Sequence, residues 1–141
     1  MTDLVLVATL GDHRIAFDAG LVEAVTDVAT SVAVPLAPAH IVGLAAARSR
    51  VLTVIDTGLA LGTEPAKGCR AIVIVHEGHR YALRVDAVED VAVPEARLGP
   101  TQSPAGPVWS AAAVETLAMA TGFALLLDPA RVIAGPLLKA A

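Results

Sequence analysis

The sequence predicts an all-β protein built from small antiparallel barrels, with one short helix. Short apolar runs rich in valine, leucine and isoleucine follow one another closely and are separated by glycine- and proline-containing turns, a pattern typical of barrels and sandwiches. No helical pattern follows each strand, as it would in a βαβ sheet. Hydrophobic residues make up 55% of the 141 residues and aromatic residues only 3%, so aliphatic side chains must fill the core. The length fits a single domain over residues 1–141, either undivided or formed by two lobes that share a core.

The first half opens with a predicted hairpin. Residues 4–10 form a strand-like run that ends at Gly11-Asp12, and residues 14–17 provide the returning strand. Residues 19–25 fit either a short helical turn or another extended segment, because their apolar positions suit both periods.

A connector and a buried strand complete the first half. Pro35 and Pro38 exclude a helix from the connector. Residues 41–47 either pair with the preceding segment or lead as a coil to a turn that holds two arginines. The β-branched run 51–55 that follows is typical of a buried strand.

The second half restarts the pattern of the first. The polar, Pro- and Gly-containing residues 63–68 are interpreted as a link between two lobes, which we expect to span approximately residues 12–66 and 67–141. A strand at 71–75 and a second strand at 80–85, joined by a short Gly-containing turn, form the clearest predicted hairpin. Because both halves begin with a strand, a turn and a strand, the sequence indicates a pair of related barrels.

The remainder of the second half combines a strand, a long loop and a helix. Residues 86–93 alternate apolar and polar side chains, which suits a strand with one solvated face that ends at Pro94. Residues 98–107 are a breaker-rich loop, after which Ser110 is placed to cap an Ala-rich helix that reaches about Ala120. Two short elements close the chain, a strand at 123–127 and a last element at 130–133.

Charge and cysteine content limit the function classes. The net charge is −4 and the cations are scattered, which argues against a nucleic-acid surface. The acidic N-terminus lacks the basic region of a signal peptide, so we expect a cytoplasmic protein. The most apolar stretch, 108–127, is interrupted by Glu115 and Gly122, and no membrane insertion is expected. The single Cys69 excludes an internal disulfide and a multi-thiolate metal site.

The strongest enzymatic pattern is Asp56-Thr57-Gly58. It follows an apolar strand and has the sequence form of the catalytic loop of retropepsin-like aspartic proteases. In a dimer, two such loops would bring two carboxylates so close that only one ionises, and this pair would activate a water. Leu59, where those proteases carry a small residue, and the position of the motif deep in the chain argue against this alternative.

No other catalytic or metal-binding set is predicted. His76 and His79 belong to a Gly-containing hairpin turn, whereas zinc-protease histidines lie one helical turn apart. No serine or cysteine lies in a nucleophile motif, and there is no phosphate-binding glycine loop. The sequence therefore predicts no catalytic residue, no cofactor and no metal, and it favours a binding module.

The arginine turn, its flanks and the second half together resemble the CheW family, adaptors that couple chemoreceptors to the histidine kinase CheA in bacterial chemotaxis. The resemblance covers nearly the whole chain and depends on the order and spacing of its segments. These segments are residues 4–25 with the signature Leu21-Val22-Glu23-Ala24-Val25, Val34-Pro35 with Pro38, Ile41-Val42-Gly43-Leu44 leading to Arg48, and residues 51–56, 85–91 and 125–128.

The resemblance implies a fold, partners and binding surfaces. It implies two intertwined five-stranded SH3-like barrel lobes without catalytic activity, and it leaves open whether the terminal strands cross between the lobes. The implied partners are the signalling tip of methyl-accepting chemoreceptors and the regulatory domain of CheA. The implied receptor surface includes Val22, Gly43 and Arg48. The row Val88, Val91 and Val93 is the candidate for the kinase surface, although these valines, like Val22, are of a type found more often in a core than in an interface.

Arg48 is the leading candidate for a binding residue. A guanidinium on a fixed turn can donate forked hydrogen bonds to acids or carbonyls of a partner, although it can also pair with a carboxylate of its own chain. Arg50 is interpreted as a solvated neighbour, and Asp56 as an acceptor for turn amides.

Three positions depart from the family pattern. Ala24 occupies the place of the signature glutamate, Ser49 that of a glycine and Thr53 that of a proline. Glu23 is adjacent to Ala24, but a shift of one residue along a strand would direct it to the other face. We expect these departures to weaken receptor binding more than the fold.

Overall fold

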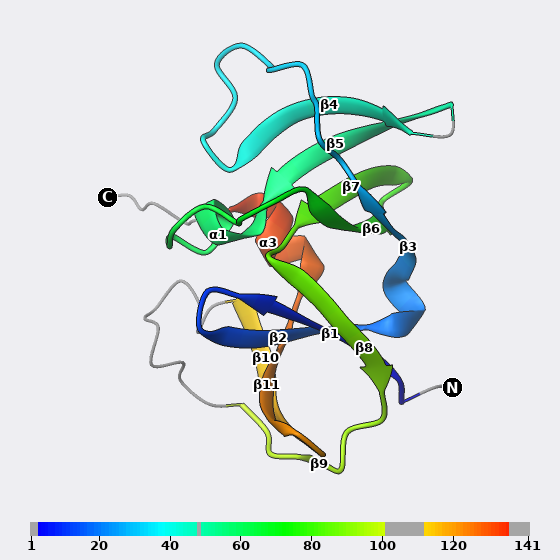
Figure 1. The fold of residues 1–141 in the computed structure, drawn as a ribbon, viewed down its shortest axis with the longest axis vertical. Coiled ribbons are helices and arrows are strands. Elements are labelled where there is room, and N and C mark those ends of the chain that lie inside the picture. The colour runs from blue at the N-terminus through cyan, green and yellow to red at the C-terminus, as the bar shows by residue number, and fades with distance from the viewer. Residues whose placement is uncertain (1–2, 48, 101–111, 136–141) are drawn as a thin grey trace.

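The structure is a computed structural model that describes residues 3–47, 49–100 and 112–135. Within these ranges it contains two β-sheets, with the short helices α1 and α3 between them (Figure 1). The predicted all-β class is confirmed.

Sheet A joins the start of the chain to its second half. Its strand order is β8-β1-β2-β11-β10-β9. Neighbouring strands are antiparallel, except that β2 and β11 are parallel. The strands are β1 (Val5–Leu10), β2 (His13–Asp18), β8 (Ala87–Ala92), β9 (Ala96–Arg97), β10 (Ala113–Met119) and β11 (Gly122–Leu127).

Sheet B contains the middle of the chain. Its order is β3-β6-β7-β5-β4, with β5 and β7 parallel and the other pairs antiparallel. The strands are β3 (Val22–Asp27), β4 (Ile41–Ala47), β5 (Arg50–Asp56), β6 (Arg70–His76) and β7 (His79–Arg84). Helix α1 (Thr57–Ala60) follows β5, and α3 (Pro129–Ala134) follows β11.

Most of the predicted strands are present. The two predicted hairpins are β1–β2 and β6–β7, and the strand predicted at 86–93 is β8. Residues 19–25, which suited either a turn or a strand, contain both: a 3-10 turn at Ala19–Leu21 leads into β3. Sheet B has the five strands that the resemblance implied, and sheet A has five longer strands and the two-residue β9.

The predicted Ala-rich helix from Ser110 to about Ala120 is wrong. Residues Ala113–Met119 form the strand β10, which pairs with β11 and directs Leu117 and Met119 into a buried cluster. Tertiary pairing and burial have overridden the helix propensity of alanine. Ser110, the expected cap, and residues 101–107 of the expected loop lie outside the described residues.

The two sheets have the same topology, and the sequence repeats with them. In each sheet an outer strand, β3 or β8, pairs with the first strand of a hairpin, β6–β7 or β1–β2. The second strand of that hairpin then runs parallel to the second strand of another hairpin, β4–β5 or β10–β11. The order β3-β6-β7-β5-β4 in sheet B therefore corresponds to β8-β1-β2-β11-β10 in sheet A. His13-Arg14 and His79-Arg80 lie 66 positions apart. Val22-Glu23 and Val88-Glu89 have the same spacing. The halves of the chain are therefore structural repeats.

The two repeats exchange their opening hairpins. The hairpin β1–β2 begins the first half but belongs to sheet A, with β8, β10 and β11 of the second half. The hairpin β6–β7 begins the second half but joins β3, β4 and β5 in sheet B. The expected lobe limits of 12–66 and 67–141 follow the halves of the chain and do not coincide with the sheets.

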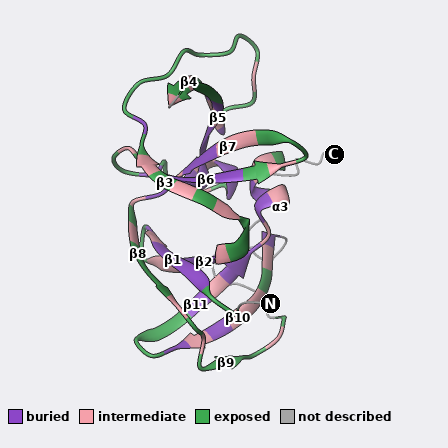
Figure 2. Ribbon diagram, turned by 90° about the vertical axis from the view of Figure 1, so that its right-hand side faces the viewer, coloured by how far each residue is buried: buried purple, intermediate pink, exposed green. Residues whose placement is uncertain are grey.

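Three apolar clusters stabilise this arrangement. The largest lies between the sheets and takes residues from both of them and from the helices, among them Phe17, Ile74 and Val132. The other two fill the inner side of each sheet. In β6, Ile72 and Ile74 face the core between the sheets whereas Val73 faces the inside of sheet B. The central strands are covered on both faces (Figure 2), which explains their continuous apolar runs.

Candidate functional site

Asp56 caps a helix and holds a loop. Its side chain is only 4% exposed. One carboxylate oxygen accepts a hydrogen bond from the backbone N–H of Leu59 at 3.0 Å, and both oxygens accept from the N–H of Ala66, at 3.0 and 3.2 Å. The bond from Leu59 satisfies an amide of the first turn of α1 that has no partner within the helix. The bonds from Ala66 hold the loop that follows α1.

The two residues after Asp56 are also used by the fold. Thr57 is buried. A side chain at Gly58 would collide with the backbone carbonyl oxygen of Glu64, so the loop can pass α1 closely only because this residue is a glycine. The Asp-Thr-Gly sequence is thus accounted for by helix capping and loop packing, and this supports the interpretation of Asp56 as an acceptor for turn amides.

Two of the four histidines, His40 and His79, form hydrogen bonds within the fold. The ring of His40 is buried, and its Nε2 lies 2.9 Å from the carbonyl oxygen of Ile133 in α3. His79 lies 2.7 Å from the hydroxyl of Thr53 and contacts the ring of Tyr81 edge to face. In the described part of the chain, no three His, Cys, Asp or Glu side chains are grouped as metal ligands.

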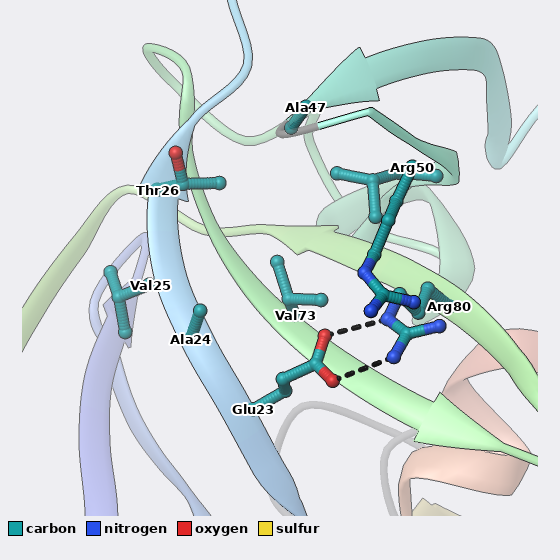
Figure 3. Close-up of a pocket in the computed structure, with 9 residues that line it drawn as sticks. Glu23, Ala24, Val25, Thr26, Ala47, Arg50, Val73 and Arg80 are labelled. Atoms are coloured by element: carbon teal, nitrogen blue, oxygen red, sulfur yellow. Dashed lines mark hydrogen bonds and ion pairs between the residues drawn. The ribbon is translucent and has the colours of Figure 1, made fainter.

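A groove of about 210 Å³ lies at the edge of sheet B and is here called the Arg50 groove (Figure 3). It lies between the outer strand β3 and the adjoining ends of β4 and β5, above the cluster that fills the inner side of the sheet. Its floor is apolar and its rim is charged. The lining residues are Glu23, Ala24, Val25, Thr26, Ala47, Arg50, Leu52, Val73 and Arg80.

An ion pair crosses this groove. Arg80, on β7, donates two hydrogen bonds to the carboxylate of Glu23 on β3, at 2.7 and 3.0 Å. These bonds, together with the charges of Arg80 and Arg50, hold the pKa of Glu23 below its ordinary value of 4.5, and the same bonds raise the pKa of Arg80. The fork geometry fixes both side chains.

Glu23 occupies a β-bulge. The register between β3 and β6 shifts between Val22 and Ala24, so Glu23 is the additional residue. As a result Val22 packs on the core between the sheets whereas Ala24, two residues later, packs on the inner cluster of sheet B. The bulge therefore aims the glutamate at Arg80 although Ala24 stands at the signature position.

The sequence interpretation placed Arg50 in solvent and did not connect it with Glu23. In the structure Arg50 is exposed, lines the groove, and its guanidinium is directed toward the Glu23–Arg80 pair (Figure 3). The repeat of His-Arg and Val-Glu at a spacing of 66 is a sequence signal that could have indicated a paired arginine and glutamate in each half. No sequence pattern indicated that Arg50 would lie next to them.

The three residues of the implied receptor surface have different environments. Val22 is half-buried against the core between the sheets. Gly43 is buried in β4 and has a φ of 157°. A side chain at this position would collide with the backbone carbonyl oxygen of Val32, so only a glycine allows the segment at Val32 to lie this close to β4. Arg48 lies outside the described residues, between β4 and β5.

The residues of the implied kinase surface lie on and just after β8. Val88 is half-buried against the core between the sheets, whereas Val91 is 44% and Val93 58% exposed. Val91 pairs with Leu6 of β1, and Leu4, just before β1, is also exposed. The exposed valines therefore belong to an aliphatic surface at the edge of sheet A.

Comparison with known proteins gives a family and a fold. A family model described as the CheW-like domain matches residues 4–136. Among solved structures, the chain is similar to the crystal structure of the scaffolding protein TtCheW from Thermoanaerobacter tengcongensis. The TM-score is 0.77 and the sequence identity 22%, over 91% of this chain and 85% of that one. No curated protein matches the chain. None of the helices described in the structure is long and apolar enough to cross a membrane.

Proposed function

This chain belongs to the CheW family, and from that membership we propose that it is a non-catalytic adaptor that couples chemoreceptors to the histidine kinase CheA in bacterial chemotaxis. The observation that carries the proposal is the match of the family model to residues 4–136, which includes both sheets. The similar solved protein is a scaffolding protein by its description. An adaptor of this kind acts in the cytoplasm.

The arrangement around Asp56 supports a non-catalytic role. A protease of the retropepsin type needs its aspartate free to share a proton with the aspartate of a second subunit and to hold a water. Here the carboxylate is almost fully buried and accepts backbone hydrogen bonds from Leu59 and Ala66. The geometry thus favours the adaptor over the aspartic protease.

We place the receptor contact at the edge of sheet B. Arg48, between β4 and β5, provides a cation for the receptor tip, and Val22 provides apolar surface on β3. Gly43 contributes indirectly, because its lack of a side chain lets the segment at Val32 pack against β4. We place the regulatory domain of CheA against the aliphatic surface of Val91 and Val93, with Val88 supporting it from the core.

The proposal is tested with the chemoreceptor and CheA of the organism that encodes this chain. The wild-type protein should co-purify with CheA and should be pulled down by a receptor signalling-tip fragment. The substitution Arg48→Glu should weaken the receptor pull-down about tenfold or more, because a charge reversal at an interface removes an attraction and adds a repulsion. Dissociation constants from fluorescence anisotropy measure the effect.

The matched control is Arg70→Glu. Arg70 is an exposed arginine of β6 that pairs with Asp27 at 3.2 Å and does not line the groove. It should leave receptor binding unchanged. If Arg48→Glu binds the receptor as tightly as the wild type, Arg48 has no part in the contact. A wild-type protein that binds neither CheA nor the receptor tip contradicts the adaptor function itself.

A further inference from the structure

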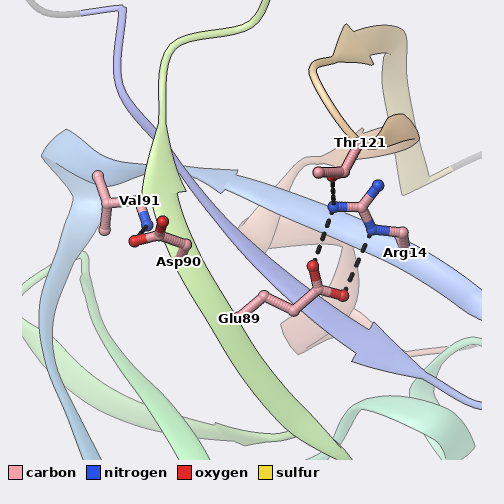
Figure 4. Close-up of polar contacts among 5 residues, drawn as sticks. All are labelled: Arg14, Glu89, Asp90, Val91 and Thr121. Carbon is pink, nitrogen blue, oxygen red and sulfur yellow. Dashed lines mark hydrogen bonds and ion pairs between the residues drawn. The ribbon is translucent and has the colours of Figure 1, made fainter.

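The two sheets carry the same arginine–glutamate pair, because the two halves are repeats. In sheet A, Arg14 of β2 donates to the carboxylate of Glu89 on β8, at 3.3 Å from Nε and 2.9 Å from Nη2 (Figure 4). Glu89 is a bulge residue, as Glu23 is, since the register between β1 and β8 skips it. The Glu23–Arg80 and Glu89–Arg14 pairs are therefore equivalent elements of the two sheets.

The pairs differ in what they contact next. Nη2 of Arg14 also donates to the hydroxyl of Thr121 at 2.7 Å, in the turn between β10 and β11. A side chain at Gly122 would come within 3.3 Å of Nη1 of Arg14, so the turn packs closely on the arginine. Glu89, Arg14 and Thr121 thus join the outer strand to the opposite hairpin and close the edge of sheet A.

In sheet B the corresponding closure is missing from the described residues. Arg80 donates to Glu23 as Arg14 does to Glu89, but within the described chain it makes no bond to the turn between β4 and β5. The space that Thr121 spans in sheet A is here the Arg50 groove, with Leu52 and Val73 on its floor. Among the described residues, the closing contact is therefore present in sheet A and not in sheet B.

Among its described lining residues, the groove holds one more positive than negative charge. Glu23 and Arg80 neutralise each other, and Arg50 makes no hydrogen bond or ion pair with the described residues. The groove therefore carries a net positive charge on a chain whose net charge is −4. Its volume of about 210 Å³ is below the roughly 300 Å³ at which small-molecule pockets begin. It suits side chains of a protein partner.

We infer that the Arg50 groove receives a carboxylate side chain of the receptor signalling tip, which hydrogen-bonds to Arg50 and closes the edge of sheet B as Thr121 closes that of sheet A. This inference rests on the proposed function and names the chemistry of its receptor contact. An aliphatic side chain next to the carboxylate packs on Leu52 and Val73. A carboxylate matches the planar donor fork of an arginine, and the apolar floor excludes water and strengthens the attraction.

The test measures binding of a labelled receptor signalling-tip fragment by fluorescence anisotropy. We expect Arg50→Ala to weaken binding about fivefold, as for the loss of an exposed ion pair. Arg50→Glu should weaken it about tenfold or more, because it also repels the carboxylate. A series of tip fragments, each with one acidic residue changed to lysine, should contain one that restores the affinity of Arg50→Glu. Thermal unfolding of each variant checks that the fold is kept.

The controls separate this inference from the proposed function. Arg70→Ala and Arg70→Glu should bind the tip as the wild type does. A wild-type protein that does not bind the tip would contradict the proposed receptor contact and this inference together. If the wild type binds but Arg50→Glu binds equally well, or if no charge swap restores affinity, the carboxylate assignment alone is wrong. A loss of CheA binding with unchanged tip binding would assign the groove to the kinase.

Discussion

At the scale of single residues, two aspartates that end apolar strands determine where the helices begin. Asp56 ends β5 and caps α1, and Asp128 follows β11 and caps α3, where its carboxylate accepts from the N–H of Ala130 at 3.0 Å. A short acceptor at this position satisfies an amide that the helix itself cannot. The two caps occupy equivalent places in the two repeats. The aspartate of the Asp56-Thr57-Gly58 motif, which resembles a protease loop, is therefore explained by helix capping.

Asp56→Asn tests this interpretation. Asparagine keeps one acceptor oxygen but presents an amide group to the N–H of Ala66, so we expect the free energy of unfolding to fall by roughly 1 kcal/mol. Asp56→Ala, which removes both acceptors from a buried site, should lower it by roughly 2 to 3 kcal/mol. Urea unfolding measures both. Binding of the receptor tip per folded molecule should not change.

The control for Asp56 is Asp12→Asn in the exposed turn between β1 and β2, which should have little effect on unfolding. A folded Asp56→Asn protein that no longer binds its partners would show that the aspartate is part of a functional site. Cleavage of peptides by the wild type that is lost in Asp56→Asn would restore the protease alternative.

At the scale of elements, the bulged glutamates fasten the outer strands β3 and β8 to the second strand of each hairpin, across the strand between them. Each glutamate reaches over one strand to an arginine. A bulge adds one unpaired residue and shifts the pairing of the residues that follow it, so that they face the other side of the sheet. This allows β3 to direct Val22 to one core, Ala24 to another and Glu23 to the ion pair.

The Glu23–Arg80 pair predicts a pH dependence of stability. The hydrogen bonds from Arg80 keep the pKa of Glu23 in the folded protein below 4.5, the value expected for the unfolded chain. The stabilisation is therefore fully present above pH 4.5 and is lost as the pH falls through the lower folded pKa. Urea unfolding of wild type and Glu23→Gln should differ most above pH 4.5, and the difference should shrink below it.

The effect should be small, because the pair is solvent-accessible and screened. Glu95→Gln, an exposed carboxylate outside the groove, is the control and should show no such convergence with the wild type. A difference between wild type and Glu23→Gln that stays constant from pH 7 to pH 3 would contradict the assignment.

At the scale of the whole molecule, Asp86 connects the two repeats at the point where they exchange hairpins. One carboxylate oxygen accepts from the N–H of Gly11 at 2.8 Å, in the turn of β1–β2, and the other accepts from the N–H of Lys67 at 2.7 Å, in the link before β6. Its own N–H donates to the carbonyl of Thr9 at 3.0 Å. A single aspartate thus holds the opening hairpin of one repeat to the link that leads into the other.

Asp86→Ala should loosen this junction. We expect a loss of about 1 to 2 kcal/mol in the free energy of unfolding, since two backbone amides lose their acceptor. The amides of Gly11 and Lys67 should exchange hydrogen faster than in the wild type, whereas those in the middle of β6 should not. Hydrogen exchange followed by NMR measures this difference. Unchanged exchange at both amides would contradict the role of Asp86, and Asp12→Ala in the same turn is the control.

The sequence by itself determined the all-β class, the two hairpins and the family. Short aliphatic runs between glycine and proline turns are local signals, and they are reliable because turn conformation and alternation depend on neighbouring residues. The sequence also led to the expectation that the chain has no catalytic residue. The Ala-rich segment after Ser110 misled the prediction because helix propensity is a weak preference that strand pairing overrides in β10.

Only the tertiary structure decided how the repeats are shared between the sheets and where the groove lies. Hairpin exchange depends on pairings between residues far apart in the chain, such as Leu125 with Ile15, and no local pattern carries that information. The same holds for the binding site. Arg50 and Arg80 are 30 positions apart in sequence and meet Glu23 only because β3 and the end of β5 border the same groove. Closure by Thr121 in sheet A and the groove that Arg50 lines in sheet B both follow from packing between strands. One half of the sequence alone does not specify that packing.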